Sequence, residues 1–271
     1  MADKKIAVIM SVYKNDVIQY VKLAVDSILC QTFKNFDFYI QCDGPIRQEV
    51  DDYLSTLTDE RIKIQKRAEN KGLAQSLNDL LAVVMPHGYE YIARMDSDDI
   101  SLPERFEKQL EYFKLHPEVE CLGSWAIEIT SNGDEYFRKQ MPQTHEDCLD
   151  LFRKRDPMIH PTVIFRRSYI EKAGMYALDT FFGEDTMMWA QGFAAGCMLG
   201  NVPEYLFKFR LDDNFFDRRR GWKYAKGIWE LRHRVNKMLG FGIVEDCWAL
   251  AYAAAKMMPK FILNIIYKIA R

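Results

Sequence analysis

A chain of 271 residues is long enough for one large α/β domain or two smaller ones. Its hydrophobic fraction of 48% and charged fraction of 28% are typical of a globular protein with a sizeable core. The formal net charge of -2 excludes an overall basic field that would attract nucleic acid. The six cysteines are widely spaced without a C-x-x-C pair, so neither a zinc site nor a redox motif is indicated.

The first part of the chain alternates between short apolar runs and helical patterns. Residues 6–12 form a near-continuous apolar run, which is typical of a central parallel strand covered on both faces. Later strands are expected at 36–42, 61–65 and 89–93, and helices after Asp16, at 47–57 and after Leu73. This order predicts a doubly wound, mostly parallel sheet with right-handed crossovers.

Polar or small residues follow each of these expected strands: Tyr13, Asp43, Asn70 with Gly72, and Asp96. Ligands bind beyond the carboxyl ends of the strands in an open α/β sheet, so these residues are expected at one binding edge. Such an edge suits a nucleotide, because a carboxylate such as Asp43 accepts hydrogen bonds from ribose or base. An ordinary turn is the alternative for Asp43.

Residues 94–99 (RMDSDD) place Asp96, Asp98 and Asp99 at the end of the fourth strand. Three crowded carboxylates repel one another unless a cation offsets their charge, and oxygen ligands at this spacing suit Mg²⁺ or Mn²⁺. The alternative is a solvated acidic turn at a helix start.

The strand-and-helix alternation then stops. Ser101, Pro103 and Glu104 have the spacing of a capping box and first helical turn, which predicts a helix over 102–115. The other expected elements are a hairpin formed by 119–130 and 135–140, a strand at 163–165, and helices at 221–239 and 243–258. We therefore expect a mixed-sheet extension of the same domain and C-terminal helices.

Two further groups in the second half are candidates for function. His160 precedes a proline and a strand, where it is either a structural residue or part of a site. Gly183 permits an unusual backbone angle, and Glu184 and Asp185 begin a helix. Acids at a helix start normally just complement the helix dipole, but a carboxylate there beside a water-poor cleft is well placed as a general base.

The C-terminal part is rich in basic residues. Arg218, Arg219 and Arg220 form either a solvated helix entrance or a clamp for diphosphate. The tail at 256–271 combines apolar and basic residues and is interrupted by Pro259, so it is a poor transmembrane candidate. It fits a basic amphipathic helix on an anionic membrane surface, or a helix packed on the core or in a dimer interface. The N-terminus is too short in its apolar part for a signal peptide, so we expect a cytoplasmic location.

Several motifs occur in a fixed order: VIMSVY at 8–13, SILCQTF at 27–33, NKGL at 70–73 with Asn78, RMDSDD at 94–99 and GED at 183–185. This ordered combination resembles glycosyltransferase family 2, whose members are inverting enzymes with the GT-A fold. The variants CDGP at 42–45 and DSDD at 96–99 are similar to the bacterial O-antigen and exopolysaccharide branch of the family.

The resemblance implies a GT-A domain over 1–215, with a nucleotide-binding half at 1–100 and an acceptor-side half at 101–215. Residues 216–271 would form a helical, basic amphipathic extension that associates with the cytoplasmic face of the inner membrane. The implied reaction moves a hexose from a UDP-sugar to an undecaprenyl-diphosphate-linked sugar in O-antigen or capsule synthesis. The implied cofactor is Mn²⁺ or Mg²⁺.

The family's functional residues carry over only to matching positions. Asp96 and Asp98 match the DxD motif that holds the cation on the donor diphosphate, and Asp185 matches the catalytic base. Cys42 replaces the first aspartate of the usual Asp-Asp-Gly nucleotide contact. The implied nucleotide-sugar contacts are Val12, Tyr13, Asp43, Asn70, Gly72, Asn78, Arg94, Asp96, Ser97 and Asp98. The candidate acceptor or diphosphate contacts, from the basic run as well as from the resemblance, are Asp99, His160, Glu184, Arg218, Arg219 and Arg220.

Other functions are compatible with parts of the pattern. A non-catalytic nucleotide-sugar-binding scaffold would keep the GT-A fold and turn Asp185 toward the core. A metal-dependent phosphotransferase also uses an Asp-x-Asp strand end, but its lysine and threonine elements are not evident in the sequence. A nucleotidyltransferase is disfavoured because no Gly-rich phosphate loop follows the first strand.

Overall fold

The structure is a computed structural model that describes residues 5–180, 182–211 and 219–258. Its first part contains parallel strands separated by helices, in the order β1 (Ile6–Tyr13), α1 (Ile18–Leu29), β2 (Phe36–Asp43), α2 (Gln48–Ser55), β3 (Ile62–Lys66), α3 (Leu73–Val84) and β4 (Tyr91–Met95). The predicted alternation of strands and helices is confirmed, with boundaries within a few residues of those expected.

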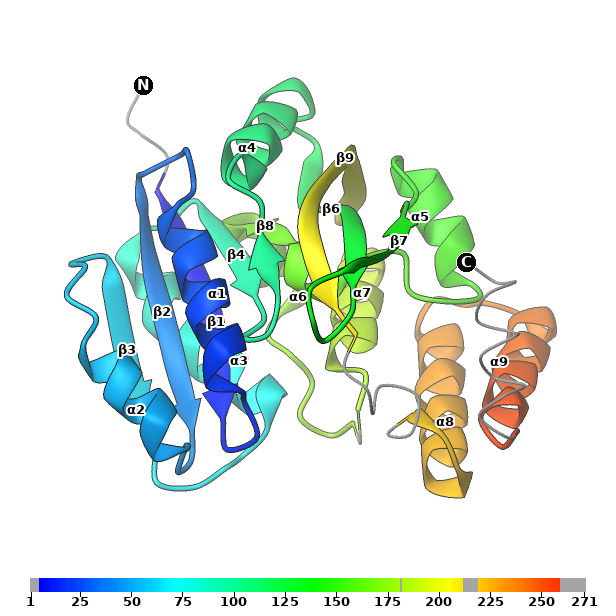
Figure 1. The fold of residues 1–271 in the computed structure, drawn as a ribbon. Helices are drawn as coiled ribbons and strands as arrows, with labels where there is room; N and C mark the ends of the chain where they lie inside the picture. The colour runs from blue at the N-terminus through cyan, green and yellow to red at the C-terminus, as the bar shows by residue number, and fades with distance from the viewer. Residues whose placement is uncertain (1–4, 181, 212–218, 259–271) are drawn as a thin grey trace.

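The second part mixes strands and helices. In chain order they are β5 (Ile100–Ser101), α4 (Arg105–Leu115), β6 (Val119–Ile129), β7 (Glu135–Lys139), α5 (His145–Phe152), β8 (Ile164–Arg166), α6 (Arg167–Ala173), α7 (Glu184–Ala194), β9 (Met198–Arg210), α8 (Trp222–Met238) and α9 (Ile243–Ala255). One sheet runs through the molecule in the order β3-β2-β1-β4-β8-β6-β9-β5, with β7 paired to β6 (Figure 1). Because β8 is antiparallel to both β4 and β6, the predicted mixed-sheet extension is confirmed.

The core lies on both faces of the sheet. Ile6 and Val8 of β1 point into a cluster shared with α1, α2 and α4, whereas Ala7 and Ile9 point into a second cluster with α3, α6 and α7. All four side chains are completely buried. A strand covered on both faces has no polar side, which is why its sequence is a continuous apolar run.

The long strand β9 was not predicted. It contains Pro203, which cannot donate to a sheet ladder and argues against a central strand. The structure accommodates the proline with a shift in register, because Ser124 of β6 pairs with Val202 and the next residue, Trp125, pairs with Tyr205. The two unmatched residues form an irregularity that leaves the rest of the ladder intact.

The predicted capping box at the start of α4 is wrong. Ser101 lies in β5, where its hydroxyl accepts a hydrogen bond from the Gln31 side chain at 3.1 Å. The helix begins at Arg105, after Pro103, and its cap residue Glu104 makes no side-chain capping bond. Pairing of β5 with β9 holds Ser101 in an extended conformation that local capping preference could not overcome.

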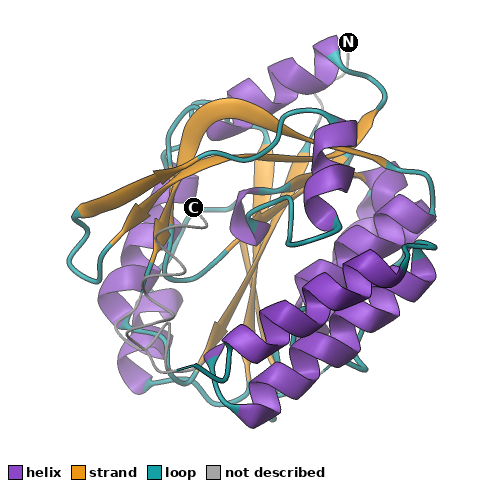
Figure 2. Ribbon diagram, turned by 90° about the vertical axis from the view of Figure 1, so that its right-hand side faces the viewer, coloured by secondary structure: helices purple, strands orange, loops and turns teal. Residues whose placement is uncertain are grey.

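The helices α8 and α9 lie side by side at one end of the molecule, and Figure 2 turns this end toward the viewer. They confirm the two C-terminal helices expected from the sequence. Within the described residues, no helix has both the length and the apolarity needed to cross a bilayer. Most of the tail that was expected to bind membrane, from Pro259 onward, lies outside the described residues.

Gly44 is expected to be the least replaceable of the turn glycines that follow the parallel strands. It has a φ of +76°, and an added Cβ would lie 2.5 Å from the backbone nitrogen of Asn70. Gly44→Ala should lower the free energy of unfolding by about 2–4 kcal/mol through backbone strain and overlap. Gly133→Ala is the control. Gly133 also has a positive φ, of +92°, but no atom lies within 4 Å of an added Cβ, so this substitution should cost only about 1 kcal/mol. Equal losses in urea unfolding would contradict this account.

Candidate functional site

The carboxyl ends of the parallel strands bring predicted site residues to one edge of the sheet. Tyr13 at the end of β1 pairs in register with Asp43 at the end of β2, and β4, which ends just before Asp96, adjoins β1 on its other side. The Asn70 side chain donates to the Asp43 carbonyl, and the Gly72 amide donates to the Asp43 carboxylate, both at 3.0 Å. The predicted gathering of these residues is confirmed, while their contacts with a nucleotide stay predictions.

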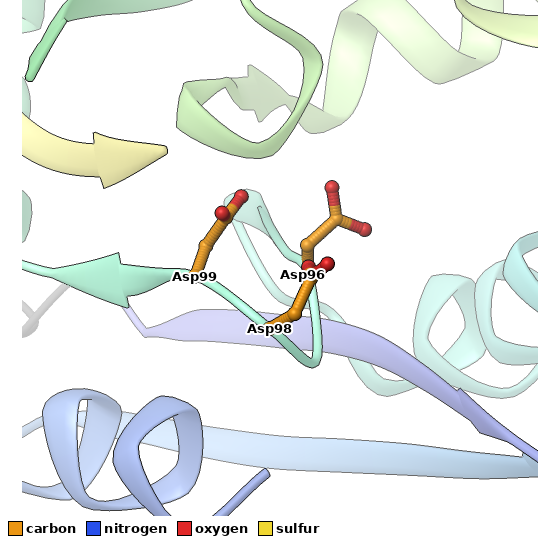
Figure 3. A group of neighbouring side chains, drawn as sticks. All are labelled: Asp96, Asp98 and Asp99. Carbon is orange, nitrogen blue, oxygen red and sulfur yellow. The ribbon is translucent and has the colours of Figure 1, made fainter. Parts of the chain in front are cut away.

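The carboxylates of Asp96, Asp98 and Asp99 gather on one side of the loop between β4 and β5 (Figure 3). One oxygen of each residue lies within 4.8 Å of the others. Asp99 is 1% exposed, and its Oδ1 accepts a hydrogen bond from the Arg210 amide at 2.7 Å. Its Oδ2 is buried and has no hydrogen-bond partner among the described residues. An unsatisfied buried oxygen beside two further carboxylates fits a divalent cation better than a solvated turn.

The surroundings of this acidic cluster, Asp96, Asp98 and Asp99, disfavour negative charge. Burial, and then the charges of Asp96 and Asp16, raise the pKa of Asp98 to about 7. Burial, and then the charges of Asp98 and Asp96, raise the pKa of Asp99. Asp16, just before α1, is a fourth acid at this edge, and burial raises its pKa to about 6. A bound divalent cation would reverse these shifts, because it stabilises the ionised carboxylates.

Two arginines hold the loop that carries the acidic cluster. Arg94, in β4 and 1% exposed, forms an ion pair with Asp96. Arg210, the last residue of β9, donates its Nε to the Asp98 carbonyl at 2.8 Å. Its Nη1 donates to two backbone carbonyls that follow β6, each at 3.1 Å. The loop is therefore fixed from β4 on one side and from the mixed half of the sheet on the other.

Other residues predicted to bind the nucleotide differ in how accessible they are. Val12 is completely buried in the core, so its contact with the nucleotide stays a prediction. Tyr13 is partly exposed at the sheet edge. Ser97 is 7% exposed and forms a hydrogen bond with the Asp16 side chain.

Asp43 anchors the loop after β3 and is 2% exposed. Its carboxylate pairs with Arg67 and accepts hydrogen bonds from the amides of Lys71 at 2.8 Å and Gly72 at 3.0 Å. Arg67 also donates to the Asp79 carboxylate at 2.7 Å. These bonds hold the β2 end, the β3–α3 loop and the start of α3 together without a ligand, and the nucleotide contact of Asp43 stays a prediction.

Asn78 and His160 lie deeper than the sequence indicated. The Asn78 side chain exchanges two hydrogen bonds of 2.9 Å with the backbone of Tyr176. The Tyr176 hydroxyl is 2.8 Å from His160 Nε2. Burial, and then the charge of Arg94, hold the pKa of His160 well below its usual range, so the ring is neutral. Their contacts with the donor and the acceptor stay predictions.

A second acidic group lies at the start of α7. Gly183 has a left-handed φ of +79°, as the sequence indicated, and leads the chain into the helix. Asp185 is partly exposed, and its Oδ1 accepts a hydrogen bond from the Thr186 amide at 2.7 Å. Burial, and then the charges of Asp156 and Glu184, raise the pKa of Asp185 to about 7. A carboxyl group that titrates near neutrality suits proton transfer.

Tyr176 lies near both acidic groups. Burial raises the pKa of Tyr176, the charge of Arg94 lowers it, and the charges of Glu184 and Asp185 raise it. Arg94 also pairs with Asp96 of the acidic cluster. The Tyr176 hydroxyl is therefore within electrostatic reach both of Arg94 and of Glu184 and Asp185 in α7. The fold thus brings the two predicted halves of the site toward each other.

The basic run is only partly described. Arg218 lies outside the described residues, while Arg219 and Arg220 are exposed just before α8. The charge of Arg219 offsets part of the effect of burial on the pKa of Asp185. Arg219 therefore supplies positive charge on the Asp185 side of the site, and its contact with a diphosphate stays a prediction.

Sequence reasoning missed Asp16, Arg67, Asp156 and Tyr176 as parts of the site. Asp16 follows the first strand by three residues, a position comparable to that of the other strand-end acids, so a weak signal was present. Asp156 accepts hydrogen bonds from the Thr186 hydroxyl at 2.9 Å and from Arg232 at 2.8 Å. Contacts between segments so far apart in the chain left no local pattern.

The chain matches the family model described as glycosyl transferase family 2 over residues 7–174. It is 29% identical to the amylovoran biosynthesis glycosyltransferase AmsE of Erwinia amylovora, over 97% of each chain. It is 30% identical to the UDP-Gal:alpha-D-GlcNAc-diphosphoundecaprenol beta-1,3-galactosyltransferase of Escherichia coli, over 82% of this chain and 79% of that one.

The fold is also that of solved glycosyltransferases. The mannosyltransferase PcManGT from Pyrobaculum calidifontis, solved in complex with GDP-Man and Mn²⁺, superposes with a TM-score of 0.56 at 14% identity. The match covers 98% of this chain and 79% of that one. The architecture is therefore the GT-A fold. The chain belongs to glycosyltransferase family 2 and is a glycosyltransferase.

Arg67→Met should lower the free energy of unfolding by about 3–5 kcal/mol, because it leaves the buried Asp43 carboxylate without its cation. The control is Arg138→Met, which removes an exposed pair with Glu135 and should cost less than about 1 kcal/mol. Urea unfolding followed by circular dichroism measures both. A loss for Arg67→Met no larger than the control's would contradict the anchoring role.

Proposed function

We propose that this chain is a metal-dependent inverting glycosyltransferase that moves a hexose from a UDP-sugar to a lipid-diphosphate-linked sugar. The product would be part of a bacterial surface polysaccharide, an O-antigen or a capsule. The observation that carries the proposal is the acidic cluster at the sheet edge, with its buried, unpartnered oxygen on Asp99. The name of the Escherichia coli relative supports a UDP-sugar donor and a diphosphoundecaprenol-linked acceptor, and that of AmsE supports polysaccharide synthesis.

In this proposal Asp96 and Asp98 would hold Mn²⁺ or Mg²⁺. A cation held there would offset charge on the diphosphate leaving group, an effect that supplies several kcal/mol of transition-state stabilisation. The Mn²⁺ in the complex of PcManGT supports a divalent cation in this fold. The nucleotide and sugar lie along the edge formed by Val12, Tyr13, Asp43, Asn70, Gly72, Asn78, Arg94 and Ser97.

Asp185 acts as the general base. It takes the proton from an acceptor hydroxyl as that oxygen bonds to the anomeric carbon and the bond from carbon to the UDP oxygen breaks. A single displacement inverts the anomeric centre and gives a β-linkage from an α-linked UDP-sugar. The pKa of about 7 supports this role, since the carboxylate form is present at neutral pH and is still basic enough to accept a proton.

The acceptor side would be the half at 101–215 together with the basic extension at 216–271. Arg219 and Arg220, with Arg218, would bind a diphosphate through their guanidinium groups. The basic tail would keep the enzyme at the cytoplasmic face of the inner membrane, beside a lipid-linked acceptor. Asp99, His160 and Glu184 would be the further contacts with the acceptor or its diphosphate.

The scaffold alternative required Asp185 to face the core. In the structure Asp185 is partly exposed, on the same side as Arg219, so this observation favours the catalytic function.

Calorimetric binding of UDP with and without Mn²⁺ tests the donor site. The wild type should bind UDP more tightly by at least about tenfold with the metal, and Asp98→Asn should lose that gain because one metal ligand is gone. Asp150→Asn is the control, since Asp150 is a 79% exposed acid of α5. Metal-independent binding, or full metal dependence in Asp98→Asn, would overturn the assignment. Absence of UDP binding under any metal condition would reject UDP as the donor nucleotide.

Asp185→Asn should lower the turnover number by about 10²- to 10⁴-fold while leaving UDP binding unchanged. In the wild type the rate should rise with pH through about 7, because protonated Asp185 cannot accept a proton and its pKa is about 7. This rise should disappear in Asp185→Asn. A variant that keeps the same pH-dependent rise would contradict the role of Asp185, and Asp150→Asn again serves as the control.

A further inference from the structure

The helix α9 is oriented opposite to an ordinary surface helix. Its two acids face inward, where Glu245 pairs with Arg153 at 2.9 Å and Asp246 accepts from Asn236 at 2.8 Å. Its outward face has no charged residue and includes Ile243, Val244, Cys247, Trp248, Leu250 and Ala254. The side chains of Ile243 and Leu250 are 79% and 58% exposed.

Such a face costs solubility, so something apolar is expected to cover it. An ordinary surface helix turns its charges to water and its apolar stripe to the core. Contiguous exposed apolar surface marks an interaction site with a protein or a membrane. The ion pair of Glu245 with Arg153, just after α5, and the hydrogen bond of Asp246 with Asn236 of α8 show that the orientation of α9 is held by specific contacts.

The surroundings of this apolar face are basic. Residues 219–258 contain eight Lys and Arg but only three Asp and Glu, in a chain whose net charge is -2. Of the eight, Arg232 is buried and pairs with Asp156, and Lys226 pairs with Glu230. Two of those three acids are the inward-facing ones of α9. The Lys154 ammonium lies 5.4 Å from the centre of the Trp248 ring, at the edge of the face. Exposed Lys226 and Lys237 lie on the adjacent helix α8.

We propose that the outward face of α9 docks on the surface of an anionic phospholipid bilayer. An apolar helix face flanked by lysine and arginine, with Trp248 at its edge, is the pattern of an interfacial helix. Negative headgroups attract the basic flank, while the apolar side chains enter the boundary between headgroups and acyl chains. A helix of 13 residues spans about 20 Å, too short to cross a bilayer, so α9 lies in the plane of the interface.

Charge favours the bilayer over a second copy of this chain. A two-fold dimer through α9 would bring two identical basic flanks together, and like charges across an interface repel. Docking of α9 would also bring the site near the bilayer. The helix packed against α9, α8, starts two residues after Arg220, next to the basic run beside Asp185. The proposal rests on the function proposed above, since a lipid-linked acceptor is presented at a bilayer. The observation behind it is the exposed apolar surface of α9.

Vesicle flotation of the full chain tests the proposal, with phosphatidylcholine vesicles that contain or lack phosphatidylglycerol. The wild type should float with the anionic vesicles and not with the neutral ones, and high salt should weaken binding. Leu250→Glu should weaken binding by at least about tenfold, because it removes an inserted apolar side chain and adds negative charge. Val244→Glu, at a second exposed position of the outward face, should act in the same direction.

The matched control is Leu115→Glu, which makes the same change at a 72% exposed leucine at the end of α4. It should leave flotation unchanged. Circular dichroism and metal-dependent UDP binding are measured on every variant, so a failed donor assignment is distinguished from a failed membrane surface. Flotation that survives Leu250→Glu and Val244→Glu would overturn the proposal and move the contact to another part of the chain, such as the basic tail. A wild-type dimer in light scattering that Leu250→Glu dissociates, without flotation, would make the face a protein interface instead.

Discussion

Electrostatic repulsion among buried carboxylates is the constraint on which the site depends. Asp96, Asp98 and Asp99 share one loop, and Asp16 adds a fourth acid from the neighbouring strand end. The ion pair of Arg94 with Asp96 compensates part of this charge, and Arg210 fixes the loop only through backbone atoms and the Asp99 carboxylate. The second oxygen of Asp99 is buried and has no hydrogen-bond partner in the described part of the chain, so the fold holds the acids in an arrangement that a cation would stabilise.

The same principle, burial beside neighbouring acids, operates at the start of α7. Asp185 shares its surroundings with Asp156 and Glu184, and the result is a carboxyl group that titrates near neutrality. Neutral His160 lies 2.8 Å from the Tyr176 hydroxyl, and the charge of Arg94, which pairs with Asp96, acts on the pKa of both. Both regions crowd carboxyl groups that burial and neighbouring acids make harder to ionise, which supports the cation-binding and general-base roles proposed for them.

Much of the fold could be predicted because local pattern and tertiary structure agree there. The continuous apolar run of β1 and the helical spacing of α1 and α3 indicate elements that the sheet then uses directly. The prediction failed where long-range pairing decides the outcome. Ser101 has the sequence of a helix cap but lies in a strand, because β9 pairs with it. The strand β9 contains Pro203 but remains a strand, because its pairing with β6 shifts register at the proline. The short helices α5 and α6 were also not predicted, although Thr144 caps α5 by accepting a hydrogen bond from the Asp147 amide at 3.2 Å.

By itself the sequence determined the parallel half of the sheet, the acidic loop at its edge and the family, because strand-end motifs and hydrophobic period are local properties of the chain. Only the tertiary structure decided that Asp16, Arg67 and Tyr176 belong to the site, since each contacts residues distant in sequence. It also decided which way α9 faces. A helical pattern gives the spacing of apolar residues, but the partners Arg153 and Asn236 determine that the acids of α9 turn inward and its apolar side turns to solvent.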